Sequence, residues 1–393
     1  MFEGLKITEK VGTMEKQTGY IARENLEAKL ETVTSWDDAR KIIVKNNKIR
    51  KNLPNSYAVD PRNDLPIIYV PARAKRPGHN GNGKNGQQVQ GNGSCVICDG
   101  TDAMPVVRMR DLPDSKTDDG KQAVAFINLN LFPPLGPKEI YDIMDNSKDS
   151  LSGGLFLLWA SNMHADIDNM SYNDNKACID LMSEFEKTML HSSGRGSFKQ
   201  LQKGVDHYGH MQIIKNKGKS VGGSIEHGHY QMGYFPILPK RIIDDRKFAD
   251  EKGKSFASYI LEKNPDELEI KKYCGDVSLL VPCCAMKRPL DALIIPKDTS
   301  RNYLHDLKED EKKGIAMALC DVTKALSDIM PGMGKEFAYN LEFHTSTGFY
   351  IEVLPFTQED GGYERAGMFV CQSEPQAAAE IYNETFSKFK ISK

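Results

Sequence analysis

The chain has 393 residues, of which 39% are hydrophobic and 27% charged, and its formal net charge is −2. Domains commonly contain about 100 to 200 residues, so this length predicts two domains or two fused half-domains. A net charge so close to zero gives no global electrostatic sign of a protein that binds nucleic acid or a membrane surface.

Targeting signals and cysteine usage favour a cytoplasmic protein. No apolar run approaches the ~18 residues that a membrane helix needs, and the N-terminal residues lack the apolar core of a signal peptide. Eight cysteines spread over so long a chain are not typical of a secreted disulfide scaffold. Cys95 and Cys98 stand at C-x-x-C spacing, which in a reducing compartment indicates metal binding or redox chemistry.

In chain order, residues 1–56 are polar and helix-prone, and we predict that they form an N-terminal helical arm. A short strand is predicted at 67–72. Residues 78–94 are rich in Gly, Asn and Gln, and a loop is expected because they have almost no apolar side chains to bury. The elements expected next are strands at 123–132 and 153–161, a helix at 172–192, a strand at 206–216, a Gly-rich basic turn at 216–224 and a strand at 225–235.

The order of strands, helix and strands recurs in the second half. A helical region (240–270) precedes a β-hairpin (277–297), a helix (306–329), two strands (337–356) and a final helix (374–389). We therefore predict an α+β fold with two related halves, 57–238 and 239–393, each an antiparallel sheet with helices packed on it.

The most informative segment is Ser224-Ile-Glu-His-Gly-His-Tyr-Gln231. Side chains alternate between the two faces of a strand, so His227, His229 and Gln231 should share one face. Three polar groups on one face of an otherwise apolar strand need partners or a task. The pattern favours a histidine that attacks phosphorus beside a group that holds a metal or an oxygen. Satisfied core histidines are the structural alternative.

The segment H-G-H-Y-Q resembles the H-P-H-x-Q motif of galactose-1-phosphate uridylyltransferases, which belong to the histidine-triad superfamily. Other blocks agree with that family, and the resemblance extends in the family's order from about residue 57 to residue 385. These blocks are R-A-K-R-P at 73–77, C-V-I-C-D-G at 95–100, N-K-G-K-S-V-G-G-S at 216–224, Y-I-E-V-L-P at 350–355 and G-Y-E-R-A-G-M at 362–368. The implied fold is two histidine-triad-like halves, the first carrying the catalytic site.

The resemblance also implies a structural zinc ion. Its ligands would be Cys95, Cys98, His164 and His227, and a Cys2His2 set without an open position is typical of a structural site. Some family members have a second metal position built on an H-x-H in the second half. Those positions hold Tyr350 and Glu352 here, so we predict no second metal site.

The implied chemistry is transfer of a nucleoside monophosphate in two steps. His229 would attack the α-phosphorus of a nucleoside diphosphate sugar to give a covalent nucleotidyl-histidine, and a sugar phosphate or phosphate would then accept the nucleotide. Gln231 would donate a hydrogen bond to the transferring phosphoryl group. The residues expected to bind the nucleotide and its phosphates, together with the backbone N–H groups of the Gly-rich turn, are Arg73, Arg76, Asn130, Asn216, Gly222 and Ser224.

Departures from the family pattern leave the substrate open. Gly228 replaces the usual Pro, Tyr230 replaces a small residue, and Gln358 stands where some uridylyltransferases have a Lys. The leading hypothesis is uridylyl transfer between UDP-glucose and a hexose 1-phosphate. An adenylyl-transferring phosphorylase acting on ADP-glucose or a diadenosine polyphosphate is the second, and a non-catalytic, zinc-structured nucleotide-binding protein is the third. Simple hydrolysis is disfavoured because Gln231 cannot donate a proton. The resemblance implies a homodimer.

Overall fold

A computed structural model describes most of the chain. The described residues are 20–31, 33–51, 56–63, 65–75, 95, 97–98, 105–130, 133–134, 136, 154–159, 161–192, 210–223, 225–235 and 238–391. The predicted loop at 78–94 lies outside them. Within the described part, no helix combines the length and apolar character needed to cross a bilayer.

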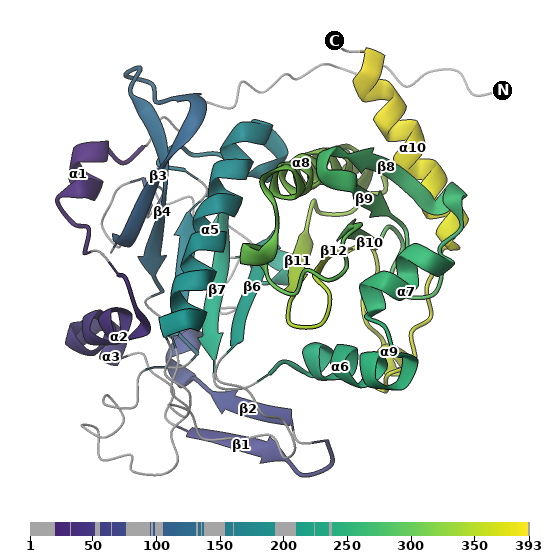
Figure 1. Cartoon of the computed structure of the whole chain (residues 1–393), viewed down its shortest axis with the longest axis horizontal. Helices are drawn as coiled ribbons and strands as arrows, with labels where there is room; N and C mark the ends of the chain where they lie inside the picture. The colour runs from purple at the N-terminus through teal and green to yellow at the C-terminus, as the bar shows by residue number, and fades with distance from the viewer. Residues whose placement is uncertain are drawn as a thin grey trace, which may run out of the picture.

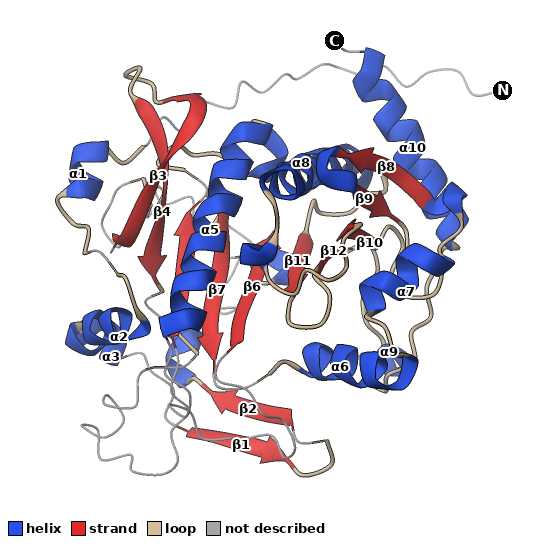
Figure 2. Ribbon diagram, in the orientation of Figure 1, coloured by secondary structure: helices blue, strands red, loops and turns tan. Residues whose placement is uncertain are grey.

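In the described part of the chain, ten strands form one sheet, whose strands Figure 2 shows in red and which passes behind the helix α5 (Tyr172–Ser192). Their spatial order is β3-β4-β5-β7-β6-β11-β12-β10-β9-β8, and every adjacent pair is antiparallel. The first-half strands are β3 (Pro105–Lys116), β4 (Gln122–Leu129), β5 (Gly154–Trp159), β6 (His210–Lys217) and β7 (His229–Phe235). The second-half strands are β8 (Glu269–Tyr273), β9 (Val277–Leu280), β10 (Ala292–Pro296), β11 (Tyr339–His344) and β12 (Tyr350–Pro355).

Each half has the same topology. Three consecutive strands are followed by a long helix, and the last two strands of the half then return in swapped order, as β7-β6 and β12-β11. The helices are α5 (Tyr172–Ser192) and α8 (Glu309–Gly332). The halves join where β6 pairs with β11. The predicted α+β fold with a repeated order of elements is therefore confirmed.

Helices α5 and α8 pack against each other on one face of the sheet (Figure 1). They cover the largest core cluster, to which β7 contributes Tyr230, Met232 and Tyr234. Residues of β7 that alternate with these three, including His229 and Gln231, therefore point to the opposite face. Helices α6 (Lys240–Lys252) and α7 (Phe256–Lys263) lie in the second half. Ala257 and Ile260 of α7 pack with Leu280, Leu293, Ile295 and Tyr350.

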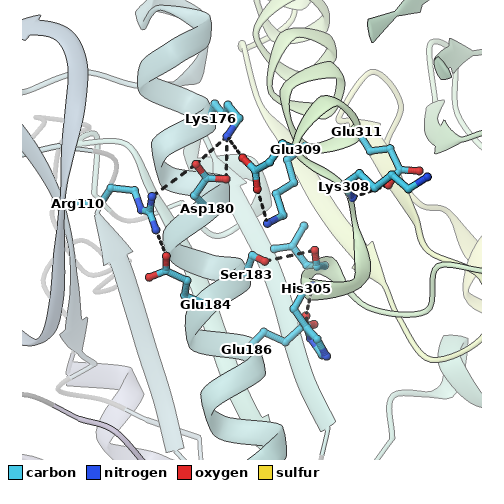
Figure 3. Close-up of polar contacts among 12 residues, drawn as sticks. Arg110, Lys176, Asp180, Ser183, Glu184, Glu186, His305, Lys308, Glu309 and Glu311 are labelled. Carbon is cyan, nitrogen blue, oxygen red and sulfur yellow. Dashed lines mark hydrogen bonds and ion pairs between the residues drawn. The ribbon is translucent and has the colours of Figure 1, made fainter. Parts of the chain in front are cut away.

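Polar contacts hold α5 to its neighbours on the helical face (Figure 3). Lys176 bridges Asp180 on its own helix and Glu309 at the start of α8, with N–O distances of 2.8 and 2.7 Å. Deeper along α5, Glu186 is fully buried and accepts hydrogen bonds from the backbone and ring of His305. These contacts fix the two long helices relative to each other, and thereby the two halves of the sheet.

The N-terminal region contains three short helices, α1 (Arg23–Glu27), α2 (Trp36–Lys45) and α3 (Asn47–Arg50). The side chain of Ser35 accepts a hydrogen bond from the Asp38 N–H and caps α2, as helix N-termini require. Ile21 and Leu26 pack on the sheet face opposite α5, against Val124 and Phe126.

Most predicted elements are present, and three strands were missed. The helices predicted at 172–192 and 306–329 and the hairpin at 277–297 are confirmed. The last helix is α10 (Pro375–Ile391), as predicted, and α9 (Gly362–Arg365) precedes it. The strand predicted at 67–72 is β2 (Leu65–Tyr69), which ends before the 3-10 helix η1 (Pro71–Lys75). The missed strands are β1 (Ser56–Asp60), β3 and β8. β3 and β8 are the edges of the large sheet, and both pair with their neighbours through register shifts. The sequences of these two strands do not alternate regularly between apolar and polar residues, so the sequence did not predict them.

Candidate active site and metal centre

Four predicted metal ligands converge at one end of the first half. Cys95 and Cys98 meet His164, from the loop after β5, and His227, which directly precedes β7. The sulfur of Cys98 lies 3.6 Å from Nδ1 of His164 and 3.4 Å from Nδ1 of His227, and the sulfur of Cys95 lies 3.7 Å from the latter. Tetrahedral zinc with bonds of about 2.3 Å to sulfur and about 2.05 Å to nitrogen would separate these atoms by about 3.6 Å. The donor set and its spacing therefore fit one tetrahedral metal ion.

Neighbouring groups orient the His227 ring and favour the thiolate form of Cys95. The ring N–H at Nε2 of His227 donates to the carbonyl of Ser161 at 2.8 Å, so the lone pair faces the sulfurs at Nδ1. A hydrogen bond with Cys98 lowers the pKa of Cys95, and further bonds from His164 and His227 act in the same direction against burial. The thiolate, which is the metal-binding form, is thus favoured. Ile97, between the cysteines, is buried in the cluster around Ile21 and Phe126 and anchors this turn.

The structure corrects one part of the predicted strand. β7 begins at His229, not at residue 225, so His227 lies outside the alternating pattern. His227 does not share a strand face with His229 and Gln231, because its ring turns toward the cysteines. His229 and Gln231 do alternate with the core residue Tyr230, as predicted.

His229 is held in a defined tautomer at the start of β7. Its Nδ1 donates to the carbonyl oxygen of His227 at 2.9 Å, which leaves the lone pair on Nε2. The side chain is only 4% exposed. Burial, supported by the nearby positive charge of Lys215, lowers its pKa to about 4. His229 is therefore a neutral imidazole at physiological pH, the form that a nitrogen nucleophile requires.

Adjacent strands arrange further polar residues on the same face of the sheet. Gln231 pairs with Ile214 of β6, and Ile214 pairs with Glu342 of β11. On the other side, Gln231 pairs with Leu157, which in turn pairs with Asn128. Directly paired residues of an antiparallel sheet share a face, so Asn128 and Glu342 each lie two strands, or about 10 Å, from Gln231. Sequence reasoning selected Asn130, a buried residue just beyond β4, but missed Asn128 and Glu342.

A buried ion triad supports the loop that carries His164. Asp166 binds Nζ of Lys215 at 2.6 Å and Nζ of Lys217 at 3.1 Å, and its side chain is 5% exposed. Burial alone would raise the pKa of Asp166, but the two lysine charges outweigh it and lower the pKa to about 2. The triad joins the metal-ligand loop to β6, next to the histidine segment. No motif signalled it in advance.

Gly228 fits tightly against this loop. Its N–H donates to the carbonyl of Ala165 at 2.9 Å, and a Cβ at this position would lie 2.5 Å from the same oxygen and 2.6 Å from Oδ1 of Asp166. The loop leaves no room for a side chain between the two histidines, so glycine here is a packing requirement.

We therefore expect Gly228→Pro to be harmful, although it restores the usual H-P-H motif. The variant loses the hydrogen bond to Ala165 and forces the loop away, which should lower stability by about 2–3 kcal/mol and displace His229. Thermal unfolding measures the first effect, and the rate of the nucleotidyl transfer expected from the sequence motifs measures the second. Gly228→Ala, which keeps the N–H, separates the clash from the lost bond, and Gly332→Ala, with nothing within 4 Å of the new Cβ, is the matched control. Full activity of Gly228→Pro would contradict this account.

The Gly-rich turn differs from the expected phosphate nest. The N–H groups of Lys219 and Ser220 donate to the carboxylate of Glu336 from the second half, at 2.8 and 3.2 Å. The N–H groups of Gly222 and Gly223 donate to carbonyls within the turn itself. These four amides already have acceptors, so the expectation that they bind phosphate is wrong for this conformation. The side chain of Asn216 remains as a donor at this end of β6.

For the remaining predicted site residues, the described part of the chain shows no contact that supports their proposed roles. Arg73 lies in η1, which follows the two-stranded β1–β2 sheet, and its contact with phosphate stays a prediction. Arg76 and Ser224 lie outside the described residues.

The second half gathers acidic groups around His344. Potential ligand atoms of Glu342, His344 and Glu352 lie within 4.8 Å of one another. However, the ring nitrogens of His344 each lie 3.2 Å from a carboxylate oxygen, one of Asp245 on α6 and one of Glu352. Burial lowers the pKa of His344, but hydrogen bonds to Asp245 and Glu352 outweigh it and raise the pKa to about 9. These contacts make His344 part of an ion network that fastens α6 to the sheet.

No protein-family model matches the chain, but curated proteins and solved structures are similar to it. The chain is 27% identical over 198 residues to an ADP-glucose phosphorylase of Arabidopsis thaliana, covering 46% of this chain and 53% of that protein. It is 34% identical over 152 residues to a galactose-1-phosphate uridylyltransferase of Thermotoga maritima, covering 38% and 43%. A solved uridylyltransferase structure superposes with a TM-score of 0.60 at 17% identity, covering 85% of this chain and 99% of the other.

These similarities support the resemblance to the galactose-1-phosphate uridylyltransferase family that the sequence motifs indicated. The similar proteins include an ADP-glucose phosphorylase as well as uridylyltransferases. The matched stretches span only about half the length of these curated relatives, and the solved uridylyltransferase supports the fold alone. Activity and substrate for this chain therefore have to be argued from its own site.

Proposed function

We propose that this chain is a nucleotidyltransferase that carries a nucleoside monophosphate on Nε2 of His229. The observation that carries the proposal is the bond from Nδ1 of His229 to the carbonyl of His227. That bond, together with burial, presents a neutral nitrogen lone pair beside a Cys2His2 cluster that fits a metal ion. Similarity to proteins named as uridylyltransferases and as a phosphorylase supports the same chemistry.

In the first step, Nε2 of His229 forms a bond to the α-phosphorus of a nucleoside diphosphate sugar, while the bond from that phosphorus to the bridging oxygen breaks. The sugar phosphate departs with the electron pair. In the second step, an oxygen of a hexose 1-phosphate or of inorganic phosphate attacks the same phosphorus and the P–N bond breaks, which regenerates His229. Gln231 and Asn216 would donate hydrogen bonds to the non-bridging oxygens, and Arg73, Arg76 and Ser224 would contribute to phosphate binding.

A bound zinc would be structural, since four protein ligands leave no open position. Cys95, Cys98, His164 and His227 would hold it. It would fix His227, two residues before His229, and such anchoring places a reacting atom accurately. We also propose a homodimer, on the family resemblance alone.

Uridylyl transfer to a hexose 1-phosphate is the leading proposal, and adenylyl transfer to phosphate is the second. The second proposal is supported by the residue at position 358. Gln358, at the position where some uridylyltransferases have a Lys, uses its amide to hold the 370–372 segment, donating to the carbonyl of Val370 and accepting from the N–H of Gln372. This side chain therefore offers no cation to a hexose phosphate.

The deciding experiment is intact-protein mass spectrometry after brief incubation with UDP-glucose, and separately with ADP-glucose, without an acceptor. We expect a mass increase equal to one uridylyl group, which is UMP less one water, from the first donor. An AMP-sized increase from ADP-glucose alone would keep the mechanism and assign the chain to the phosphorylases. No increase from either donor, with metal still bound, would refute transfer from both donors and favour a non-catalytic nucleotide-binding protein.

A further inference from the structure

The joint between the two halves of the sheet passes through the proposed site. At this joint β6 pairs with β11, and Asn216 stands directly opposite Asn340. On the other side of β6, Ile214 pairs with Gln231, and continuing that register by two residues places Asn216 opposite His229. A side chain of the second half thus lies next to the proposed phosphate-binding amide of the first.

The hydrogen bonds at Asn340 determine the orientation of both amides. Nδ2 of Asn340 donates to the carbonyl oxygen of Val221 at 3.4 Å and to Oδ1 of Asn216 at 2.6 Å. A backbone carbonyl only accepts, so the group of Asn340 that faces it must be the NH2. The same NH2 group then requires the oxygen of Asn216. The NH2 of Asn216 is consequently turned away from Asn340, and in the part of the chain that the structure describes it has no protein acceptor.

This orientation matters because an asparagine amide shows a donor on one side and an acceptor on the other. A phosphate oxygen is stabilised by an N–H donor and repelled by a carbonyl oxygen. We propose that Asn340 is a positioning residue, which fixes the amide of Asn216 so that its NH2 faces the transferring phosphate. The inference rests on the proposed function, because it assumes that Asn216 contacts that phosphate.

The test compares variants that remove the restraint with one that inverts it. Asn340→Asp is nearly isosteric, but its carboxylate only accepts, so Asn216 must turn its NH2 inward and present oxygen to the phosphate. Asn340→Ala removes this hydrogen bond, so the amide of Asn216 can adopt either orientation. Asn216→Ala removes the donor. The rate of nucleotidyl adduct formation is measured for each variant with the donor that labels the wild-type protein, and metal content and thermal unfolding show that each variant is folded.

We expect Asn340→Asp to slow the adduct about 10- to 100-fold, as much as Asn216→Ala and more than Asn340→Ala. The double variant Asn216→Ala/Asn340→Asp should be no slower than Asn216→Ala alone, which excludes simple charge repulsion by the new carboxylate. A wild-type rate for Asn340→Asp, equal losses in Asn340→Asp and Asn340→Ala, or additive losses in the double variant would each overturn the inference.

Equilibrium binding separates this inference from the proposed function. In a His229→Ala background, which cannot form the adduct, calorimetry measures the affinity for UDP-glucose and ADP-glucose. Asn340→Asp should weaken binding in that background too. If the wild type forms the adduct, and the Asn340 variants form it at the same rate and bind the donors with the same affinity, only the inference about Asn340 fails. If the wild type forms no adduct and the His229→Ala protein binds neither donor, the proposed function and the inference fail together.

Discussion

The His229→Ala variant is expected to lose covalent nucleotidylation by at least about 10⁴-fold, because the nitrogen that forms the P–N bond is gone. The neighbouring imidazole of His227 cannot take its place, because both of its ring nitrogens already face other groups. His227, the nearest histidine in sequence, points Nδ1 toward the cysteines and Nε2 toward the carbonyl of Ser161. The adduct measured by intact mass should be absent from the variant under conditions that label the wild type completely.

Metal content distinguishes loss of the nucleophile from loss of structure. His229→Ala should retain one metal ion per chain and a wild-type unfolding midpoint within a few degrees. His227→Ala should lose the metal, because it removes one of four ligands. His191, an exposed histidine in the last turn of α5, is the matched control, and His191→Ala should label normally. A fully labelled His229→Ala protein would show that another residue carries the nucleotide.

Replacing Asp166 with alanine is expected to lower the free energy of unfolding by about 3–5 kcal/mol. The substitution leaves Lys215, which is 1% exposed, as a buried cation without its carboxylate, and Lys217 loses the same partner. Chemical denaturation measures the loss. The double variant Asp166→Leu/Lys215→Met, which replaces the closer ion pair with apolar side chains, should be more stable than Asp166→Ala. Equal stability of Asp166→Ala and wild type would show that the triad is unimportant for folding.

The pH dependence of the free energy of unfolding is a second test of the same triad. The pKa of Asp166 is lowered from 3.8 to about 2, so the folded state binds fewer protons than the unfolded state in this range. Its contribution, roughly 2 kcal/mol from the size of the shift, is fully present above pH 3.8 and is lost as the pH falls through 2. Asp166→Ala should flatten this part of the stability profile relative to the wild type.

Much of the site was predictable from short segments of sequence. The C-x-x-C pair and the H-x-H-x-Q segment identify chemistry by residue type and spacing, and the colinear family motifs added His164 as a fourth ligand. The structure brings these four ligands together. The two long helices and the central hairpin of the second half were also predictable, because long apolar periodicities depend on local sequence.

The edge strands β3 and β8 were not predictable in the same way. They form because the sheet offers backbone partners, and their own side chains are charged and irregularly spaced. The start of β7 at His229 has a similar origin. His227 lies outside the strand because its ring turns toward Cys95 and Cys98, which are 132 and 129 residues away in sequence. Strand alternation alone placed it on the wrong face.

The sequence by itself therefore determined the members of the Cys2His2 cluster and the repeated α+β order, and it selected the proposed reacting residues, since these depend on residue identity and local spacing. Only the tertiary structure decided what orients and restrains them: the Asp166 triad behind Gly228, the occupation of the Gly-rich turn by Glu336, and the bond from Asn340 to Asn216. The last two connect residues more than 110 positions apart, at separations of 117 and 124 for the amide of Lys219 and the side chain of Asn216. Such partners are set by strand register across the joint between the halves, and register is a property of the assembled sheet rather than of any one segment.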